Sequence, residues 1–185
     1  KTTLAMIIAN STNMNFEKLS AVTSGVKNIR EVINKAEDGL KLYNKRTILF
    51  IDEIHRFNKA QQDALLPFVE RGIIILIGAT TENPYFEVNK ALLSRMMVIP
   101  LQSLSKEDIR RIIINGLTNK EKGLGCYKVN ISDEAIEYLI TISDGDGRLA
   151  LNSLEIGVLS TPKDEQGIIN IGLDTIKECI LVKAA

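Results

Sequence analysis

The sequence predicts an α/β fold, a parallel sheet flanked by helices, which a smaller helical part follows. Segments with helical periodicity alternate with short apolar runs over residues 1–101, a pattern typical of parallel sheets. Two of these runs are almost wholly apolar, as expected of strands buried on both faces. After Pro100 only helical patterns remain, so we place a boundary between residues 1–101 and residues 102–185.

The strands of the first part are predicted from apolar runs of strand length. They lie over residues 16–21, 47–51, 73–79 and 96–101. The runs at 47–51 and 73–79 hold almost no polar side chain, so we expect these two strands to be fully buried.

The helices of the first part are predicted from apolar residues at helical spacing and from cap residues. They lie near residues 4–8, 25–38, 58–72 and 90–93. Ser24 is the expected N-cap and Gly39 the expected C-cap of the second of these helices. In the third, Asn58 and Gln61 match a capping box, and Pro67 should produce a kink.

The second part is predicted to be a small helical bundle. Three of its helices start after cap residues, which are Ser105, Ser132 and Asp146. A fourth helix is expected over residues 172–182. The stretches 118–130 and 160–171 are rich in turn-forming residues and are predicted to be loops.

The composition indicates a globular protein. The chain has 185 residues with 23 basic and 23 acidic side chains, and 45% of its residues are hydrophobic, which excludes a disordered chain, a collagen and a disulfide scaffold. Residues 1–101 carry 13 basic and 10 acidic side chains, a net charge of +3, whereas residues 102–185 carry 10 and 13, a net charge of −3. A polyanion should therefore prefer the first part.

Cysteine usage and hydropathy predict the cellular compartment. Cys126 and Cys179 are 53 positions apart, in neither metal-binding nor redox spacing, so we expect two reduced thiols. The apolar runs are strand-sized, as at Ile73–Ile77, and a membrane span needs ~20 residues. Because no signal-peptide pattern is found either, we expect a cytoplasmic protein without a membrane partner.

The segment 48–53 is the most informative for function. Four apolar residues precede Asp52 and Glu53, and the strand would present both carboxylates at its carboxyl end, where α/β sheets bind ligands. In a nucleotide hydrolase the first acid holds Mg²⁺ and the second orients the attacking water. The alternative is a strand that ends in a solvated turn.

Lys1 and Thr2 match the end of the phosphate-binding loop G-x-x-x-x-G-K-[ST]. Lys1 would then reach the β- and γ-phosphates of a nucleotide, and Thr2 would place its hydroxyl on Mg²⁺. The first helix would add its N-terminal N–H groups. The alternative is an exposed terminus, because Lys-Thr pairs are common.

Three further residues are candidates for contacts with phosphate. Thr81 follows the predicted strand 73–79 and would bond the γ-phosphate or the attacking water, unless Thr80–Pro84 is simply a turn. Arg95 is either a solvated cation at a helix end or an arginine finger supplied to a neighbouring subunit, and Arg148 is open to the same two interpretations.

His55 completes the string Asp52-Glu53-Ile54-His55, which literally matches the DExH motif of helicases. Such helicases need two motor lobes, roughly twice this length if a domain is about 150 residues. The second part here is acidic and helical. His55 is therefore expected to be a polar loop residue, and a metal ligand is disfavoured because the chain has no second histidine.

Together these segments resemble an AAA+ ATPase of the RarA/MgsA type, the replication-associated recombination family whose eukaryotic relative is the Werner helicase-interacting ATPase. The resemblance covers nearly the whole chain in order, and it lies in Lys1–Thr3, Ser20–Lys27, Leu49–Lys59, Ile77–Pro84 and Ala91–Arg95. It implies an AAA+ P-loop NTPase core, residues 1–101, followed by an all-α lid, residues 102–185.

The resemblance also implies an ATP hydrolase with ATP and Mg²⁺ as cofactors. Lys1, Thr2 and Thr3 fall on the end of its Walker A motif, and Asp52 and Glu53 fall on its Walker B motif. Thr2 and Asp52 would be the Mg²⁺ ligands, and Glu53 would act on the water.

The remaining motifs of the family concern the γ-phosphate. Thr81 falls most nearly on sensor 1, with Thr80 and Asn83 as adjacent candidates. Arg95 falls on the arginine that reaches into the neighbouring subunit's ATP site. Gly145–Asn152 resembles the sensor 2 segment, which puts Arg148 on the γ-phosphate, although Gly147-Arg148-Leu149 stands where the family tends to have Ala-Arg-Arg.

The biological role that the resemblance implies is that of a DNA-dependent ATPase in replication-fork maintenance, recombination and repair. Its expected partners are single-stranded or forked DNA, further copies of itself and single-strand DNA-binding protein, in a nucleoid-associated cytoplasmic location. The family's first strand and glycine loop precede its Walker lysine, so we expect residues 1–185 alone to bind ATP weakly or not at all. The alternatives are a non-hydrolysing clamp-loader-like scaffold subunit and a DExH-type helicase.

Overall fold

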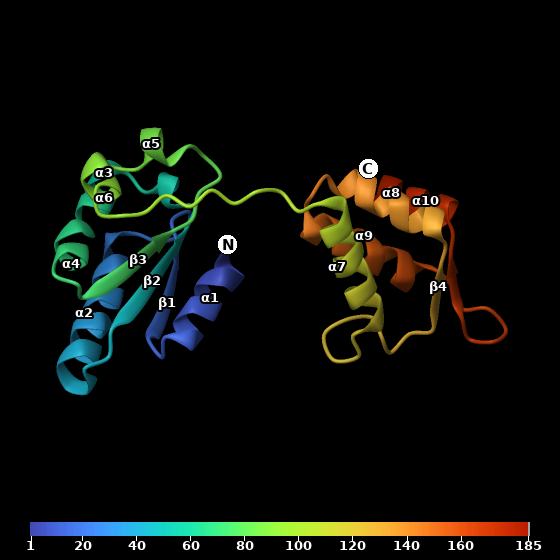
Figure 1. Cartoon of the computed structure of the whole chain (residues 1–185), viewed down its shortest axis with the longest axis horizontal. Coiled ribbons are helices and arrows are strands. Elements are labelled where there is room, and N and C mark those ends of the chain that lie inside the picture. Colours follow the sequence, from blue (N-terminus) through green and yellow to red (C-terminus); the bar gives the residue numbers. More distant parts are fainter. Residues whose placement is uncertain (185) are drawn as a thin grey trace. The chain divides into compact units, whose positions relative to one another are not determined.

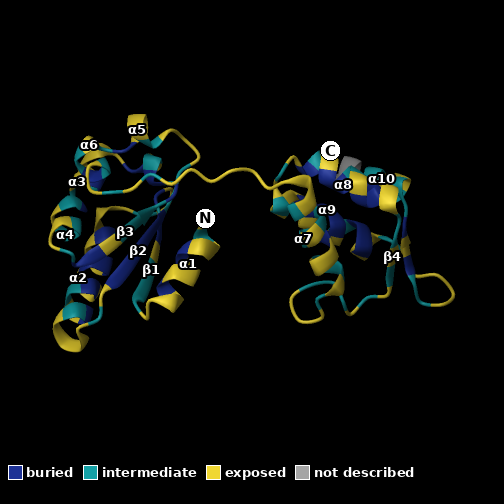
Figure 2. Ribbon diagram, in the orientation of Figure 1, coloured by how far each residue is buried: buried dark blue, intermediate teal, exposed yellow. Residues whose placement is uncertain are grey.

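The computed structural model of the chain describes residues 1–184. It divides into two compact units, Lys1–Ile99 and Pro100–Ala185, and Ala185, the last residue of the predicted second part, lies outside the described residues. Each unit has its own hydrophobic core, which is drawn in dark blue in Figure 2. The units are therefore described one at a time.

The first unit is a three-stranded parallel sheet with helices on both faces (Figure 1). Its strands, in the spatial order β1-β2-β3, are β1 (Asn15–Ser20), β2 (Thr47–Asp52) and β3 (Ile74–Gly78). Its helices are α1 (Thr2–Ser11), α2 (Val26–Tyr43), the 3₁₀ turn η1 (Ile54–Arg56), α3 (Lys59–Asp63), α4 (Leu66–Glu70), α5 (Pro84–Glu87) and α6 (Lys90–Leu93). The α/β class predicted from the sequence is confirmed.

The central strand β2 divides its side chains between the two faces of the sheet. Leu49 and Ile51 belong to the larger core, which α2 covers. Phe50 points to the other face, where it packs with Ala5 of α1 and lies 6.3 Å from the ring of Phe16. All of β2 except Asp52 is buried, which is the burial on both faces that its apolar run predicts.

The second helix is longer than predicted, because Gly39 does not end it. The N-cap is Gly25, whose N–H donates to Asn28 Oδ1 at 3.0 Å, and the C-cap is Asn44 in the left-handed region. Gly39 is buried inside α2, and a Cβ there would lie 3.1 Å from Asn15 Nδ2. This glycine allows the helix to pass close to β1, so both predicted caps, Ser24 and Gly39, are wrong.

The third predicted helix, near residues 58–72, is two short helices. Asn58 and Gln61 form the expected capping box at the start of α3. Pro67 lies in the first turn of α4. The N–H that a proline lacks would have no partner within the helix at this position, so no hydrogen bond is lost. The predicted kink is therefore a complete break, and α5 is a helix that the sequence pattern did not predict.

Two of the strand predictions are wrong in part or in full. The segment 73–79 does form β3, but β3 is the edge strand of the described sheet and Ile75 is 36% exposed. Residues 96–101 form no strand, and Met97 and Ile99 are 84% and 69% exposed. An apolar run becomes a strand only where a neighbouring backbone can pair with it.

The second unit is helical with a small sheet. Its helices are α7 (Lys106–Thr118), α8 (Asp133–Ser143), α9 (Gly147–Ser160) and α10 (Leu173–Ala184), and Ser105, Ser132 and Asp146 cap the first three as predicted. The strands β4 (Val129–Ile131) and β5 (Ile169–Ile171) pair in parallel, in stretches predicted to be loops. Three residues are too few for alternation to be recognised in a sequence.

Two expectations from composition concern the whole described chain. Cys126 and Cys179 are both free, as expected. Among residues 1–184, no helix combines the length and the apolar character that a membrane crossing requires.

Candidate nucleotide site

The carboxyl ends of β2 and β3 form the edge at which the predicted residues meet. Ile51 of β2 pairs with Gly78 of β3. Beyond this pair, the N–H of Ala79 donates to Ile51 O at 2.9 Å, and the N–H of Ile54 donates to Ala79 O at 3.0 Å. These two hydrogen bonds fasten the segment after β2 to the segment after β3, so the residues that follow each strand lie next to each other.

Glu53 occupies an unusual backbone conformation at this edge. Its φ is +55°, in the left-handed region, which costs a non-glycine residue of order 1–3 kcal/mol; strained residues of this kind are enriched at functional sites. The hydrogen bonds of the flanking residues Ile51 and Ile54 to Ala79 hold it there. The side chain of Glu53 is 31% exposed, and Thr81 Oγ1 donates to its Oε2 at 3.3 Å.

Lys1 reaches the same edge from the face of the sheet that α1 covers, the face opposite α2. Its Nζ donates to Thr80 O at 2.6 Å. Ala5, one turn into α1, packs with Phe50 and Ala79, which anchors the start of α1 near the end of β3. Thr2 and Thr3 form the first turn of this helix, and no side chain caps it, so N–H groups of the first turn are available to an anion.

The oxygen atoms at this edge fit a magnesium nucleotide. Asp52 ends β2, and among the side chains that the structure describes, those of residues 1–179, its carboxylate forms no ion pair and no side-chain hydrogen bond. Mg²⁺ prefers carboxylate and hydroxyl oxygens and binds through one or two protein groups, with phosphates and waters completing the octahedron. The described residues contain no cluster of three acidic, histidine or cysteine side chains that could hold a metal.

The three candidates for sensor 1 have different partners. Thr81 contacts Glu53, as described above. Asn83 is the N-cap of α5, where its Oδ1 accepts the N–H of Tyr85 at 3.0 Å. The hydroxyl of Thr80 accepts the N–H of Glu82 at 3.0 Å and lies 2.8 Å from His55 Nδ1. Of the three, Thr81 is the one whose side chain contacts the carboxylate.

The two candidate arginines lie elsewhere in the chain. Arg95 follows α6, where its Nη2 lies 2.5 Å from Glu70 Oε1 and its Nη1 donates to Ala91 O at 2.8 Å. Its side chain is 41% exposed. Arg148 is exposed in the first turn of α9, in the second unit. Within the first unit, the structure thus brings Lys1, Glu53 and Thr81 to one edge but pairs Arg95 with Glu70.

The sequence pattern missed the involvement of His55. It was predicted to be a polar loop residue, yet only 10% of its side chain is exposed and Nδ1 faces both Thr80 Oγ1 and Glu53 Oε2, the latter at 3.4 Å. The available signal was its position two residues after Glu53, which places it in η1 directly beyond the sheet edge.

This edge of a parallel sheet, with a lysine at a helix start and two acids after a buried strand, defines a P-loop type of nucleotide site. The model of the ATPase family associated with various cellular activities (AAA) matches residues 1–103, and an AAA C-terminal domain model matches residues 125–185. The chain belongs to this AAA family.

Within the family, the chain is similar to proteins of replication and recombination. It is 48% identical to replication-associated recombination protein A of Haemophilus influenzae over 90% of this chain and 37% of that protein. It is 42% identical to the Bacillus subtilis protein of the same name, over 100% of this chain and 42% of that protein. It is 52% identical to ATPase WRNIP1 of Dictyostelium discoideum, over 90% of this chain and 19% of that protein. The chain thus spans less than half the length of these relatives.

A solved structure supports the fold. The RuvB Holliday junction branch migration motor of Thermotoga maritima matches with a TM-score of 0.73 and 26% identity, over 98% of this chain and 57% of that one. The AAA+ fold with a following helical domain, predicted from the resemblance, is therefore confirmed.

Proposed function

We propose that this chain is the catalytic part of an ATPase that binds ATP with Mg²⁺ at the carboxyl ends of β2 and β3. The observation that carries the proposal is the convergence of Lys1, Glu53 and Thr81 at this edge. Phosphoryl transfer requires positioned positive charge and an oriented water more than covalent chemistry. A lysine, a carboxylate and a hydroxyl at one edge meet these requirements.

Each residue has one role in this proposal. The ammonium group of Lys1 exchanges Thr80 O for the β- and γ-phosphates, and Thr2 and Asp52 hold Mg²⁺, which neutralises phosphate charge when bound. The N–H groups of the first turn of α1, which includes Thr3, bind phosphate oxygens. Glu53 orients the attacking water, and Thr81 acts as sensor 1 by hydrogen bonding to Glu53 or to the water.

The experiment that tests this proposal is Glu53→Gln in the full-length protein. The amide retains the size of the side chain but cannot accept a proton from water, so hydrolysis should fall by a factor of 100 or more, on the order of what a positioned acid–base group contributes. ATP binding should remain, because the metal ligands and Lys1 are untouched. Steady-state hydrolysis and calorimetric ATP binding measure the two effects, and unchanged turnover would refute the proposal.

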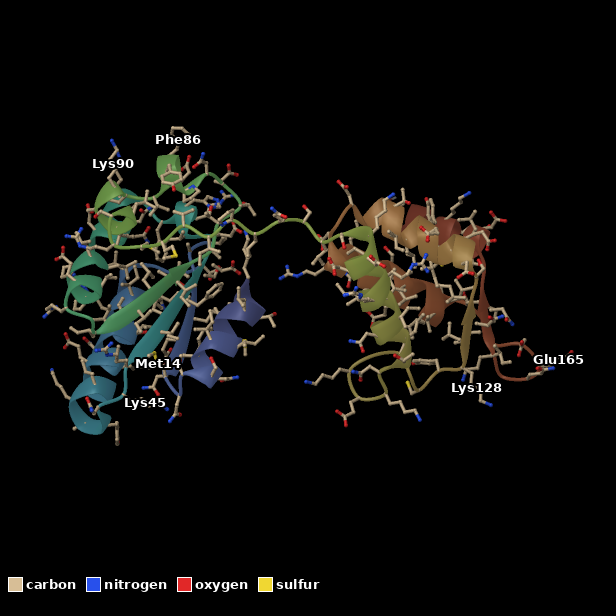
Figure 3. The ribbon with its side chains drawn as sticks, viewed as in Figure 1. Met14, Lys45, Phe86, Lys90, Lys128 and Glu165 are labelled. Atoms are coloured by element: carbon tan, nitrogen blue, oxygen red, sulfur yellow. The ribbon has the colours of Figure 1, made fainter. Side chains whose placement is uncertain are left out.

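Arg95 is proposed to act on the ATP of a neighbouring copy in a homo-oligomer. Support comes from its side chain, which is 41% exposed. In the same unit, Phe86 of α5 and Lys90 of α6 also point outward (Figure 3), and Phe86 is 84% exposed. Arg148 is proposed to reach the γ-phosphate from the helical unit as sensor 2.

The finger role of Arg95 is tested by mixing Arg95→Ala with the wild-type protein. A finger acting between subunits makes the loss of hydrolysis greater than the fraction of variant, since each variant copy disables its neighbour's site. A linear loss would instead place the action of Arg95 within its own subunit, and ATP-driven unwinding by a monomer would favour the DExH helicase. The scaffold alternative is disfavoured because Asp52, Glu53 and Arg95 are all present.

The biological setting is proposed from the relatives, whose names place them in replication and recombination. The activity would be stimulated by single-stranded or forked DNA, for which the net charge of +3 on residues 1–101 is weak support. Single-strand DNA-binding protein is a proposed partner, and a nucleoid-associated cytoplasmic location follows from a DNA-bound role.

A further inference from the structure

His55 lies between the proposed water-orienting carboxylate and the segment that holds Lys1. Its side chain is nearly buried, and its Nδ1 lies 2.8 Å from Thr80 Oγ1 and 3.4 Å from Glu53 Oε2. The carbonyl of the same Thr80 accepts Lys1 Nζ. His55, which the sequence predicted to be a polar loop residue, therefore contacts the parts of the site that follow β2 and β3.

The surroundings of Nδ1 decide which way its hydrogen bond runs. The Glu53 carboxylate can only accept, and the hydroxyl of Thr80, which accepts the N–H of Glu82, has a second lone pair that can accept a hydrogen bond from Nδ1 as well. A lone pair on Nδ1 would face the Glu53 carboxylate and repel it, whereas a proton on Nδ1 attracts both oxygens. The partner of an imidazole nitrogen sets which nitrogen carries the proton, so this proton belongs on Nδ1.

The contact matters because Glu53 has few other restraints on its side chain. About a third of it is exposed, and among the described side chains of residues 1–179 its other partner is the hydroxyl of Thr81. Thr81 and His55 both face the same oxygen, Oε2. Together they restrict the rotation of the carboxylate and leave Oε1 as the oxygen that is free to meet water.

We propose that His55 is a positioning residue: its Nδ1–H, hydrogen bonded to Thr80 Oγ1 at 2.8 Å, also attracts Oε2 of Glu53 at 3.4 Å, so that the carboxylate keeps the orientation from which it directs the attacking water. This inference rests on the proposed ATPase function. It assigns to His55 no contact with nucleotide, metal or water. Its effect is on the rate of the chemical step, not on the affinity for ATP.

Three substitutions separate this role from a merely structural one. In His55→Asn the side-chain amide nitrogen can occupy the place of Nδ1, whereas in His55→Gln the amide reaches the place of Nε2, and His55→Ala has no donor. In the full-length protein, we expect Gln and Ala to lower kcat about tenfold or more with little change in KM, since slight misplacement of a reacting group has effects of this order. Asn should restore most of the wild-type kcat.

A second measurement does not depend on activity. In protein labelled with ¹⁵N-histidine, the His55 signals are identified as those missing from His55→Gln. Nδ1 should show the chemical shift of a protonated nitrogen, and Glu53→Gln should shift it. Circular dichroism of each variant verifies that it folds.

Results that would overturn the role of His55 differ from the result that would overturn the proposed ATPase function. Equal kcat in all four proteins, equal loss in Asn and Gln, a loss confined to KM, or an unprotonated Nδ1 would each overturn the role of His55. Failure of Glu53→Gln to reduce hydrolysis would instead overturn the proposed function, and the ¹⁵N spectrum would still report the contact between His55 and Glu53.

Discussion

Gly78, the last residue of β3, lies against Ile54, the residue that follows Glu53. A Cβ added at Gly78 would lie 3.0 Å from Ile54 Cδ1 and 3.2 Å from its Cγ2, closer than the ~3.5–4.0 Å at which carbon atoms attract. Ile54 is 2% exposed and belongs to the hydrophobic core of the first unit. Gly78→Ala is therefore expected to displace Ile54 by about half an ångström, and Glu53 with it.

The cost in stability can be estimated from these contacts. Overpacking of a core costs ~1–3 kcal/mol, and replacing a strand glycine by alanine returns ~0.5–1 kcal/mol, so Gly78→Ala should lose about 1 kcal/mol. Ile54→Val removes the Cδ1 atom that causes the closest contact and by itself costs ~0.5–1.5 kcal/mol. In the double variant the closest contact is removed while Cγ2 remains at 3.2 Å, so its loss should be smaller than the sum of the single losses by up to about 1 kcal/mol.

Two assays follow this pair of substitutions. Urea unfolding monitored by circular dichroism gives the free energies of the single and double variants. In the full-length protein, ATP hydrolysis should fall in Gly78→Ala, because Ile54 directly follows Glu53, and it should recover in the double variant. If the losses of stability simply add, or if Ile54→Val does not restore kcat, the contact between these two side chains does not control the position of Glu53.

Two other predictions concern the helix caps of the second unit. Asp146 Oδ1 accepts the N–H groups of Arg148 at 2.8 Å and Leu149 at 3.3 Å, so Asp146→Ala should cost about 1 kcal/mol of stability, which is measurable as a lower Tm. Asp146→Asn is the control that retains the cap, and equal losses in both variants would contradict the prediction. The hydroxyl and then the N–H of Ser105 hold the pKa of Asp108 below its ordinary value of 3.8. A carboxyl group whose pKa is lowered by folding stabilises the fold at pH values above its pKa in the unfolded state. This stabilisation is lost as the pH falls through its pKa in the folded state. The Tm difference between wild type and Ser105→Ala should therefore be larger at about pH 7 and should shrink as the pH falls below the ordinary value of 3.8; a constant difference would exclude this linkage.

The sequence predicted the elements that carry local signals. The run at 47–51 is a buried strand, the capping box of Asn58 and Gln61 starts a helix, and Ser105 starts another. These signals are local because caps bond within one turn and because side chains alternate along a strand. The same locality explains the errors at Gly39 and at residues 96–101, where the packing of a helix against a strand and the absence of a pairing partner decided the outcome.

The sequence by itself also determined the residue types of the site, a lysine at a helix start and two acids after an apolar run. Only the tertiary structure decided which of them meet. It brought Thr81 to Glu53 across 28 positions and Lys1 to Thr80 across 79, because parallel strands bring the segments that follow them to one edge. It also turned His55 toward Glu53, since the left-handed backbone of Glu53 redirects the chain, and a one-dimensional pattern does not record that change of direction.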